Sequence, residues 1–444
     1  MLYAGIFKIR NGYLPLMSNA TINFSPRGRA VAFVLFCLTT VQLVFQHPYI
    51  VILPNERANI FSATLCLITL IITVLLCRQK SGKGIGPDFW ISLALSLIVI
   101  VSSIFSVAPR DSFERAYVIL SAGLAGYWCS KFLLNEPNFQ TIFQWLVNGL
   151  LLCVIFLALL GLYLTGKPHE FIDGHWHPVG SRLLLMSFGP LSLLLGDVRR
   201  NRIIGGIVLL IDLIAIYVVG RYAYMESILL IPAILCIMAF FIFKWTRVTR
   251  KILAVILAIT VSAGIFFAYI NPKNLNLDHI SVSYRIESLF FSIDIASKHP
   301  WLGNGLWAPR ISSLKDYTLH YPYLSKDQFS RWVIDYRTSE DLYLTFLADL
   351  GVLFFILYFG SVLYILVNFF LSSRKRTSGC MFHPAAIFLP LIAECLRFLV
   401  LDDLFHAQSS WFFHVLLGLA VLESLKKDIP DGTEKVKIIS VNDI

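Results

Sequence analysis

Hydrophobic and polar positions alternate in long blocks along this chain. About twelve apolar stretches are separated by short polar segments, and most are near the length of about 20 residues with which a helix crosses a bilayer core. They cover residues 29–47, 59–77, 88–108, 116–135, 141–165, 183–196, 202–219, 222–243, 252–271, 341–371, 382–401 and 407–424. The pattern predicts an all-α polytopic membrane protein with about twelve transmembrane helices.

Composition agrees with this interpretation. The chain is 57% hydrophobic and only 14% charged, and its mean hydropathy is +0.72, whereas about a quarter of a soluble domain is charged. No apolar core begins before Ala30 and no small-residue cleavage site follows it, so we expect no secretory signal and a first span that stays as an anchor.

The orientation follows from the basic residues. Clusters of Lys and Arg recur in every second gap between apolar stretches, for example at residues 78–83, 244–251 and 374–376. The positive-inside rule assigns these gaps, and both termini, to the cytoplasm. The net charge of +10 then reflects topology, and no nucleic-acid partner is expected. None of the eight Cys falls in an outer gap, so no disulfide framework is indicated.

The same pattern divides the chain into four parts. Residues 1–271 hold about nine transmembrane helices and residues 341–425 about three more. Between them, residues 272–340 form one large outer loop, where the apolar periodicity of Ile286–Ala296 predicts one or two short helices. Residues 426–444 form a polar cytoplasmic tail.

Three arginines stand out because the positive-inside rule predicts few on the outer face. Arg182, Arg221 and Arg285 lie at outer membrane boundaries in separate segments. The guanidinium group stays protonated and offers a planar fork of donors that suits phosphate oxygens, so the three can converge on an anionic ligand. The alternative is that each side chain snorkels to the lipid headgroups.

Other charged residues gather at the same boundary. Glu340 and Asp341 stand where the tenth apolar stretch begins, either as site residues or as carboxylates that favour a helix N-terminus. A second cluster lies at the turn between the last two stretches and contains Arg397, Asp402, Asp403 and His406. Within it, Arg397 can equally form a local pair with Glu394, three residues earlier.

Two further patterns point mainly to structure. Asp212 lies inside an apolar stretch, where a carboxylate is a functional candidate, but it is on the wrong stretch for outer-face chemistry. His175 and His177 have metal-ligand spacing, yet no third ligand accompanies them, and we expect no metal.

Two segments resemble the O-antigen polymerase and O-antigen ligase superfamily. In that family an Arg opens a helix that runs into a "hPllGvG" motif, as Arg285 runs into His299-Pro-Trp-Leu-Gly-Asn-Gly305. The segment from Glu340 to Gly351, E-D-L-Y-L-T-F-L-A-D-L-G, is similar to the family's "HNxYLQLLAELG". Arg221 in Gly-Arg-Tyr-Ala matches the family's "SRg" turn and Arg182 an Arg that precedes a short span. The layout of about twelve spans with one large periplasmic loop also matches.

The resemblance implies glycosyl transfer at the periplasmic face of the bacterial inner membrane, without cofactor or metal. The donor is a glycan on undecaprenyl diphosphate, whose diphosphate Arg182, Arg221 and Arg285 stabilise as it leaves. Ligases of the family usually carry His where this chain has Glu340, so the resemblance favours a polymerase, with Glu340 as base for the acceptor hydroxyl. The remaining residues proposed to bind diphosphate or sugar are Asp341, Tyr343, Trp307, His320, Arg397 and Asp403.

Several alternatives stay open. A ligase would move the glycan to lipid A-core or another acceptor, and His320 or His406 would then replace the family His in space. Tyr343 and Trp307 can equally serve loop packing. A carrier that binds the lipid-linked glycan without chemistry would be expected to have broken spans in matching halves and mid-membrane ionisable groups. Besides membrane lipids, a chain-length regulator is a partner expected through the resemblance alone.

Overall fold

The computed structural model describes residues 26–45, 55–76, 86–166, 176–195, 199–222, 279–306, 314, 317–320, 324–336, 341–373, 382–399 and 403–425. Every regular element in these residues is a helix, which confirms the all-α prediction for the described part of the chain. Five of the described helices are long and apolar enough to cross a membrane. Residues 223–243 and 252–271, which make up nearly all of two apolar stretches, lie outside the described residues, so the count of twelve spans stays a prediction.

The first half of the chain contributes a bundle of helices. They are α1 (Pro26–Val44), α2 (Asn55–Leu76), α3 (Pro87–Ile104), α4 (Pro109–Leu133), α5 (Pro137–Thr165), α6 (Trp176–Met186), α7 (Phe188–Leu194) and α8 (Arg199–Tyr222). The second half adds α11 (His279–Lys298), α13 (Lys326–Tyr336), α14 (Leu342–Ser373), α15 (Pro384–Arg397), the 3₁₀ helix η2 (Asp403–Phe405) and α16 (Ala407–Leu425).

Local sequence explains where many of these helices begin. Proline occupies the first turn of α3, α4, α5 and α15, where its missing N–H is not needed and its fixed φ suits a helix. At the other end, α5 stops at Gly166, whose φ of 71° is left-handed. These signals fix helix ends within the long apolar stretches.

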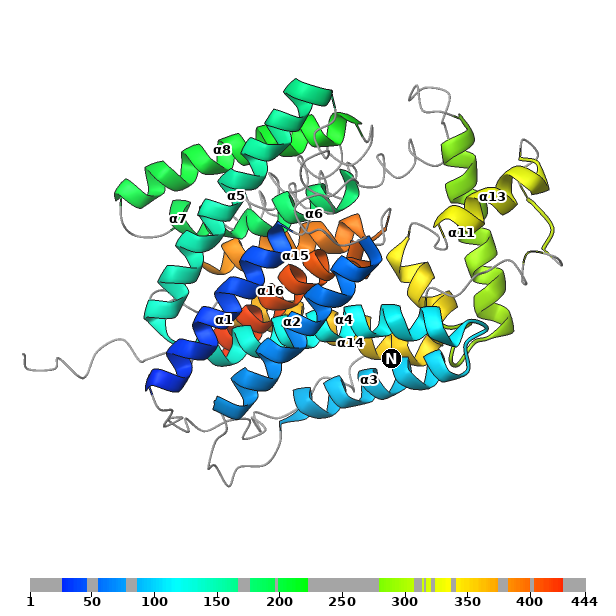
Figure 1. The fold of residues 1–444 in the computed structure, drawn as a ribbon, viewed down its shortest axis with the longest axis horizontal. Helices are drawn as coiled ribbons and strands as arrows, with labels where there is room; N and C mark the ends of the chain where they lie inside the picture. The colour runs from blue at the N-terminus through cyan, green and yellow to red at the C-terminus, as the bar shows by residue number, and fades with distance from the viewer. Residues whose placement is uncertain are drawn as a thin grey trace, which may run out of the picture.

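Helix α16 is the central element of the bundle, and it packs closely on α4 (Figure 1). Almost all of its residues are buried, and small residues allow the close approach. A Cβ on Gly126 would lie 2.6 Å from the Trp411 carbonyl oxygen, and one on Gly418 would lie 2.6 Å from that of Tyr127. By contrast, α2, α3 and α5 carry exposed large apolar side chains, as expected of helices that face lipid.

Two apolar stretches depart from a single long, regular helix. The sixth stretch forms α6 and α7, which meet at Ser187, and the apolar helical run 179–194 that they make is shorter than the helices long enough to cross a membrane. Helix α14 is broken at Gly351, whose φ and ψ are 76° and 178°. At this end of α14, helices α11 and α13 of the predicted outer loop lie together beside the bundle (Figure 1). The break in α14 frees backbone polar groups for contacts outside the helix.

Candidate functional site

The two family-like segments form one hydrogen-bonded unit. The amides of Asn304 and Gly305 donate to the carbonyl oxygens of Ala348 and Asp349, each at 2.9 Å, and the Val352 amide donates to the Pro300 carbonyl oxygen at 2.8 Å. We call residues 300–305 together with residues 348–352 the motif junction. The break in α14 frees the backbone groups of these residues from the helix, and the facing segment satisfies them.

Three glycines make the motif junction possible. Gly303, Gly305 and Gly351 all have positive φ, at 66°, 99° and 76°, a region that other residues rarely adopt. A Cβ on Gly351 would lie 2.7 Å from the Leu302 amide nitrogen and closer still to the Trp301 carbonyl oxygen. Close backbone contact between the two motifs therefore requires Gly303 and Gly351, whereas Gly305 lies against Ser106.

Helix α3 contacts both segments of the motif junction. The Ser102 hydroxyl lies 2.7 Å from the Leu302 carbonyl oxygen and 3.1 Å from that of Asp349, so it donates to both segments. Ser106 of the same helix end lies directly against Gly305. Sequence reasoning missed Ser102 because a serine inside an apolar run carries no signal of a distant partner.

A second polar cluster is buried between α6 and α15. The Ser181 hydroxyl donates to Oε1 of Glu394 at 2.6 Å, and Nη1 of Arg397 lies 3.8 Å from Oε2 of the same carboxylate. Arg182 is fully buried and donates from Nη1 to the Val44 carbonyl oxygen at 3.1 Å. We call Ser181, Arg182, Glu394 and Arg397 the buried arginine cluster. Two of the predicted arginines are therefore buried in this region: Arg397 is paired with Glu394, and Arg182 is bonded to α1, in surroundings that strengthen electrostatic effects.

Gly180 lets the two helices approach here, since a Cβ at this position would lie 3.4 Å from the Arg397 guanidinium. The Glu394–Arg397 pair predicted as a local interaction is present, and it also reaches α6 through Ser181. Sequence reasoning missed Ser181, because a single serine carries no sign of a partner on a helix 213 residues away.

The start of α14 is tied to the end of α15. The Leu342 amide donates to the Phe398 carbonyl oxygen at 2.9 Å, and the Tyr343 hydroxyl donates to that of Cys395 at 2.8 Å. Asp341 caps α14 by accepting the Leu344 amide at 2.9 Å, which is the helix-terminus role considered for it from the sequence. The half-buried Tyr343 ring packs against Phe359, and its hydroxyl is engaged with backbone. The buried arginine cluster is thus continuous with the entry to α14.

A third group lies in the predicted outer loop. The Glu287 carboxylate is fully buried, and its Oε1 accepts from the Tyr317 hydroxyl at 2.6 Å and from the His320 amide at 2.9 Å. The His320 ring is exposed and rests on Phe290 with centroids 4.9 Å apart. Burial, and then the hydrogen bond to Glu287, raises the pKa of Tyr317 above its ordinary value. These contacts fix His320 on α11 and show how the loop is anchored.

For some predicted site residues the structure gives only the position of the backbone, and others lie outside the described part of the chain. Arg221 lies in the last turn of α8, and Arg285 lies within α11, which begins earlier than predicted, at His279. Asp403 begins η2. Glu340, Trp307, Asp402 and His175 lie outside the described residues.

Asp212 is fully buried in α8, as expected for a mid-span carboxylate. Where the structure is described, no group of three metal-ligating side chains occurs.

A known protein family matches part of the chain. No curated protein is significantly similar to the chain. The family model described as O-antigen ligase matches residues 208–359, a segment that contains Arg221, Arg285 and the whole motif junction. The match, together with the apolar helices, indicates a bacterial membrane protein of the glycan ligase or polymerase type, with glycosyl-transfer activity on a lipid-linked glycan. It confirms the resemblance of this chain to the O-antigen polymerase and O-antigen ligase superfamily.

Proposed function

We propose that this protein polymerises undecaprenyl-diphosphate-linked oligosaccharide repeat units of O-antigen, capsule or exopolysaccharide at the periplasmic face of the inner membrane. The motif junction is the observation that supports it most: the two segments that resemble the superfamily, remote in sequence, form one unit through three backbone hydrogen bonds. This unit joins the segment that follows the C-terminal end of α11 to α14; Arg285 lies in the first half of α11, and Glu340 precedes α14 in the sequence.

The proposed reaction is a direct displacement. An acceptor sugar hydroxyl attacks the anomeric carbon of the donor, the bond from that carbon to the diphosphate oxygen breaks, and the configuration inverts. The hydroxyl proton passes to the Glu340 carboxylate, as carboxylates accept protons in other sugar chemistry. Undecaprenyl diphosphate leaves with the bonding electron pair.

The arginines are proposed to stabilise the charge that develops on the diphosphate. Arg221 and Arg285 are the proposed direct contacts, since a guanidinium can bind two phosphate oxygens at once. Arg182 and Arg397 lie in the buried arginine cluster and add positive potential from a site with little solvent. Tyr343, Trp307, His320, Asp341 and Asp403 remain proposed sugar or diphosphate contacts.

The alternative within the enzymes is an O-antigen ligase, and the description of the matching family favours it. The presence of Glu340 in place of the family His favours the polymerase. A carrier that moves the lipid-linked glycan without chemistry is the alternative of another class.

The test is a reaction of purified protein with a lipid-diphosphate-linked repeat unit, read by product size on a gel. Wild type and Glu340→Gln would be compared with Glu434→Gln, an equally conservative change in the predicted tail. We expect a ladder of longer glycans from wild type and Glu434→Gln, no ladder from Glu340→Gln, and no effect of a chelator. Transfer only after a lipid or protein acceptor is added would identify a ligase. Donor binding without any transfer would identify a carrier.

A further inference from the structure

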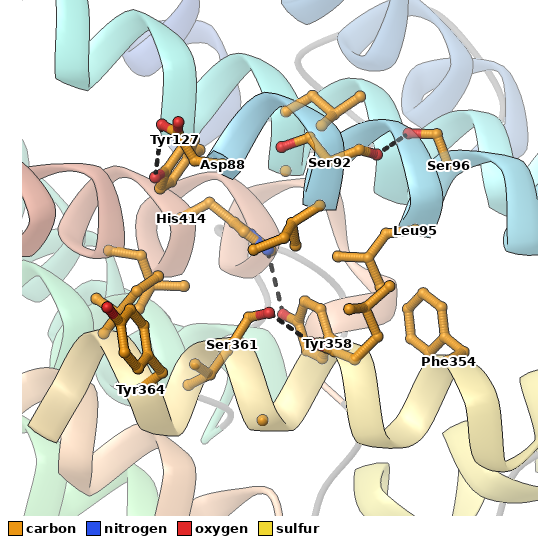
Figure 2. A pocket seen from close by; sticks show the side chains of 18 of the residues that line it. Asp88, Ser92, Leu95, Ser96, Tyr127, Phe354, Tyr358, Ser361, Tyr364 and His414 are labelled. Atoms are coloured by element: carbon orange, nitrogen blue, oxygen red, sulfur yellow. Dashed lines mark hydrogen bonds between the residues drawn. The ribbon is translucent and has the colours of Figure 1, made fainter. Parts of the chain in front are cut away.

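His414 and His320 are both held by hydrogen bonds, but only His320 keeps a ring nitrogen for a ligand. His414 lines the apolar groove between α3, α4, α14 and α16 (Figure 2). Its Nδ1 donates to the Ser410 carbonyl oxygen at 2.6 Å and its Nε2 accepts from the Tyr358 hydroxyl at 3.1 Å, so both nitrogens are used inside the protein. The exposed His320 ring is held through Nδ1 alone, and within the described residues its Nε2 has no hydrogen-bond partner.

The neighbours of Nδ1 fix where the hydrogen of the neutral His320 ring lies. Nδ1 is 3.2 Å from the Tyr317 hydroxyl oxygen and 3.4 Å from Oε1 of Glu287. The Tyr317 hydrogen is directed to that same Oε1, at 2.6 Å, so both neighbours present lone pairs to the ring. We therefore assign the ring hydrogen to Nδ1, which leaves a lone pair on Nε2.

Glu287 fixes His320 at two points. Its Oε1 also accepts the His320 amide at 2.9 Å, so one buried oxygen holds both the backbone and the ring. The Phe290 ring supports the imidazole from the side, with the ring centroids 4.9 Å apart. The His320 side chain is nevertheless 58% exposed, so a group held firmly by the protein faces solvent.

Helix α11 presents an apolar surface beside this ring. Phe290 and, one turn later, Ile293 are both exposed. We call Phe290, Ile293 and His320 the loop ledge. The exposed residues of the following turn, Ser297 and Lys298, are polar. The loop ledge therefore combines a small apolar surface with one fixed hydrogen-bond acceptor.

The loop ledge is packed onto the motif junction. Phe291, directly after Phe290, lies against Tyr317 with ring centroids 4.8 Å apart, and both belong to an apolar cluster that includes Ala348. The Ala348 carbonyl oxygen accepts the Asn304 amide within the junction. The position of the ledge relative to the junction is therefore fixed by a buried core.

The lone pair on Nε2 discriminates between the two kinds of group that a lipid-linked glycan carries. A sugar hydroxyl can donate a hydrogen bond to it, whereas an ionised diphosphate has only acceptors. The Glu287 carboxylate behind the ring adds negative potential, which further disfavours an anion. The exposed Phe290 ring suits the C–H groups of a sugar, because the face of an aromatic ring is negative.

We propose that the loop ledge binds a sugar of the glycan, with a sugar hydroxyl donating to Nε2 of His320. Glu287 is the positioning residue that keeps the ring in the accepting tautomer. The inference rests on the proposed function for the presence of a glycan, and it assigns His320 to sugar and not to the diphosphate. No covalent bond is made or broken at the ledge, so proton acceptance stays with Glu340.

Two substitutions of His320 separate the roles of its two nitrogens. The side-chain amide of asparagine reaches the place of Nδ1 but not that of Nε2, so His320→Asn keeps a donor toward Glu287 and loses the acceptor for the sugar. The longer glutamine side chain reaches the place of Nε2, so His320→Gln keeps a polar group there. His299→Asn is the matched control, since it makes the same change at an exposed histidine directly after α11.

The binding of two probes to purified protein would be measured: the repeat-unit oligosaccharide released from its lipid, and undecaprenyl diphosphate without a glycan. We expect His320→Asn to weaken oligosaccharide binding by about tenfold, the effect of losing one hydrogen bond, and His320→Gln to weaken it less. Neither variant should change the binding of undecaprenyl diphosphate, and His299→Asn should bind both probes as wild type does.

Glu287→Gln tests the positioning role. The variant keeps one acceptor oxygen, but its NH₂ group can donate to Nδ1 of His320 and so move the ring hydrogen to Nε2. We expect a higher KM for the lipid-linked repeat unit with kcat nearly unchanged. A fall in kcat with an unchanged KM would contradict the positioning role.

Several outcomes would overturn the proposal. One is equal oligosaccharide affinity of wild type and His320→Asn. Another is equal weakening of both probes, which would place the ring at the diphosphate. A fall in kcat of about a thousandfold in His320→Asn at unchanged oligosaccharide affinity would make His320 the base instead. Oligosaccharide binding that depends on His320 in a protein that transfers no glycan would sink the proposed function and leave the assignment of the loop ledge in place.

Discussion

The Val352 amide donates a hydrogen bond to the Pro300 carbonyl oxygen at 2.8 Å. This bond exists only because α14 is interrupted at Gly351, which frees the Val352 amide from the helix ladder. It connects the end of α11, a helix of the predicted outer loop, to the start of a membrane-type helix. The geometry of the whole motif junction therefore depends on the backbone at Gly351.

Replacing Gly351 with alanine should abolish the motif junction. The φ of 76° is unfavourable for alanine, and its Cβ would overlap the Trp301 carbonyl group. We expect a loss of about 2–3 kcal/mol in unfolding free energy and of most transfer activity. Thermal unfolding in detergent and the glycan ladder would measure both. Gly360→Ala on the same helix should be neutral or stabilising, because its backbone is helical and the space is open. Equal stability of the two variants would contradict the expected role of Gly351.

Ser102→Ala should weaken the motif junction without removing it. The variant loses the hydroxyl that bonds to Leu302 and Asp349, at a cost of about 1 kcal/mol. The neighbouring Ser103 is the matched control, since its hydroxyl bonds to the Val99 carbonyl oxygen of its own helix. We expect lower kcat for Ser102→Ala than for Ser103→Ala at similar Tm. If the two variants have the same kcat, α3 does not position the junction for the reaction.

Much of the fold was predictable because apolar periodicity and basic clusters report on lipid exposure directly. The exposed faces of α3 and α5, which contain residues such as Leu97 and Phe156, are the kind of surface that such a pattern describes. The breaks were harder to predict. Gly351 lies in the longest apolar run, where hydropathy is high on both sides of it, so only its motif context marked it.

The candidate site was predictable only in part. Arg182 and Arg397 were identified as outer arginines, but sequence offered no sign that Ser181 would bridge to Glu394. Pairing between distant helices depends on tertiary packing, which a single sequence does not report. The capping role of Asp341 was foreseen as one alternative because local helix-terminus chemistry is readable from sequence.

The Glu394–Arg397 pair allows a test of structural against functional roles. Arg397→Met leaves a buried carboxylate without its cation and should cost about 3–5 kcal/mol in unfolding free energy. Adding Glu394→Leu removes that penalty, so the double variant should recover much of the stability. If Arg397 supplies potential at the diphosphate, the stable double variant stays below one tenth of wild-type activity. Recovery of activity together with stability would assign the pair to folding alone.

Tyr317 provides the pH-dependent prediction. Its hydroxyl bonds to the buried Glu287 carboxylate, and burial together with this bond raises its pKa above the ordinary value of about 10. A raised pKa of this group means that its contribution to stability is fully present below about pH 10 and is lost as pH rises above that value, because the unfolded tyrosine ionises first.

Tyr317→Phe leaves the Glu287 carboxylate with one donor fewer and should cost about 1–3 kcal/mol at neutral pH. We therefore expect a lower Tm than wild type at pH 7 and a gap that narrows above pH 10, measured by thermal unfolding of both proteins in detergent. His299→Ala, an exposed change at the end of α11, should show neither effect. A gap that stays constant to pH 11 would show that Tyr317 contributes through packing on Phe291 rather than through its hydroxyl.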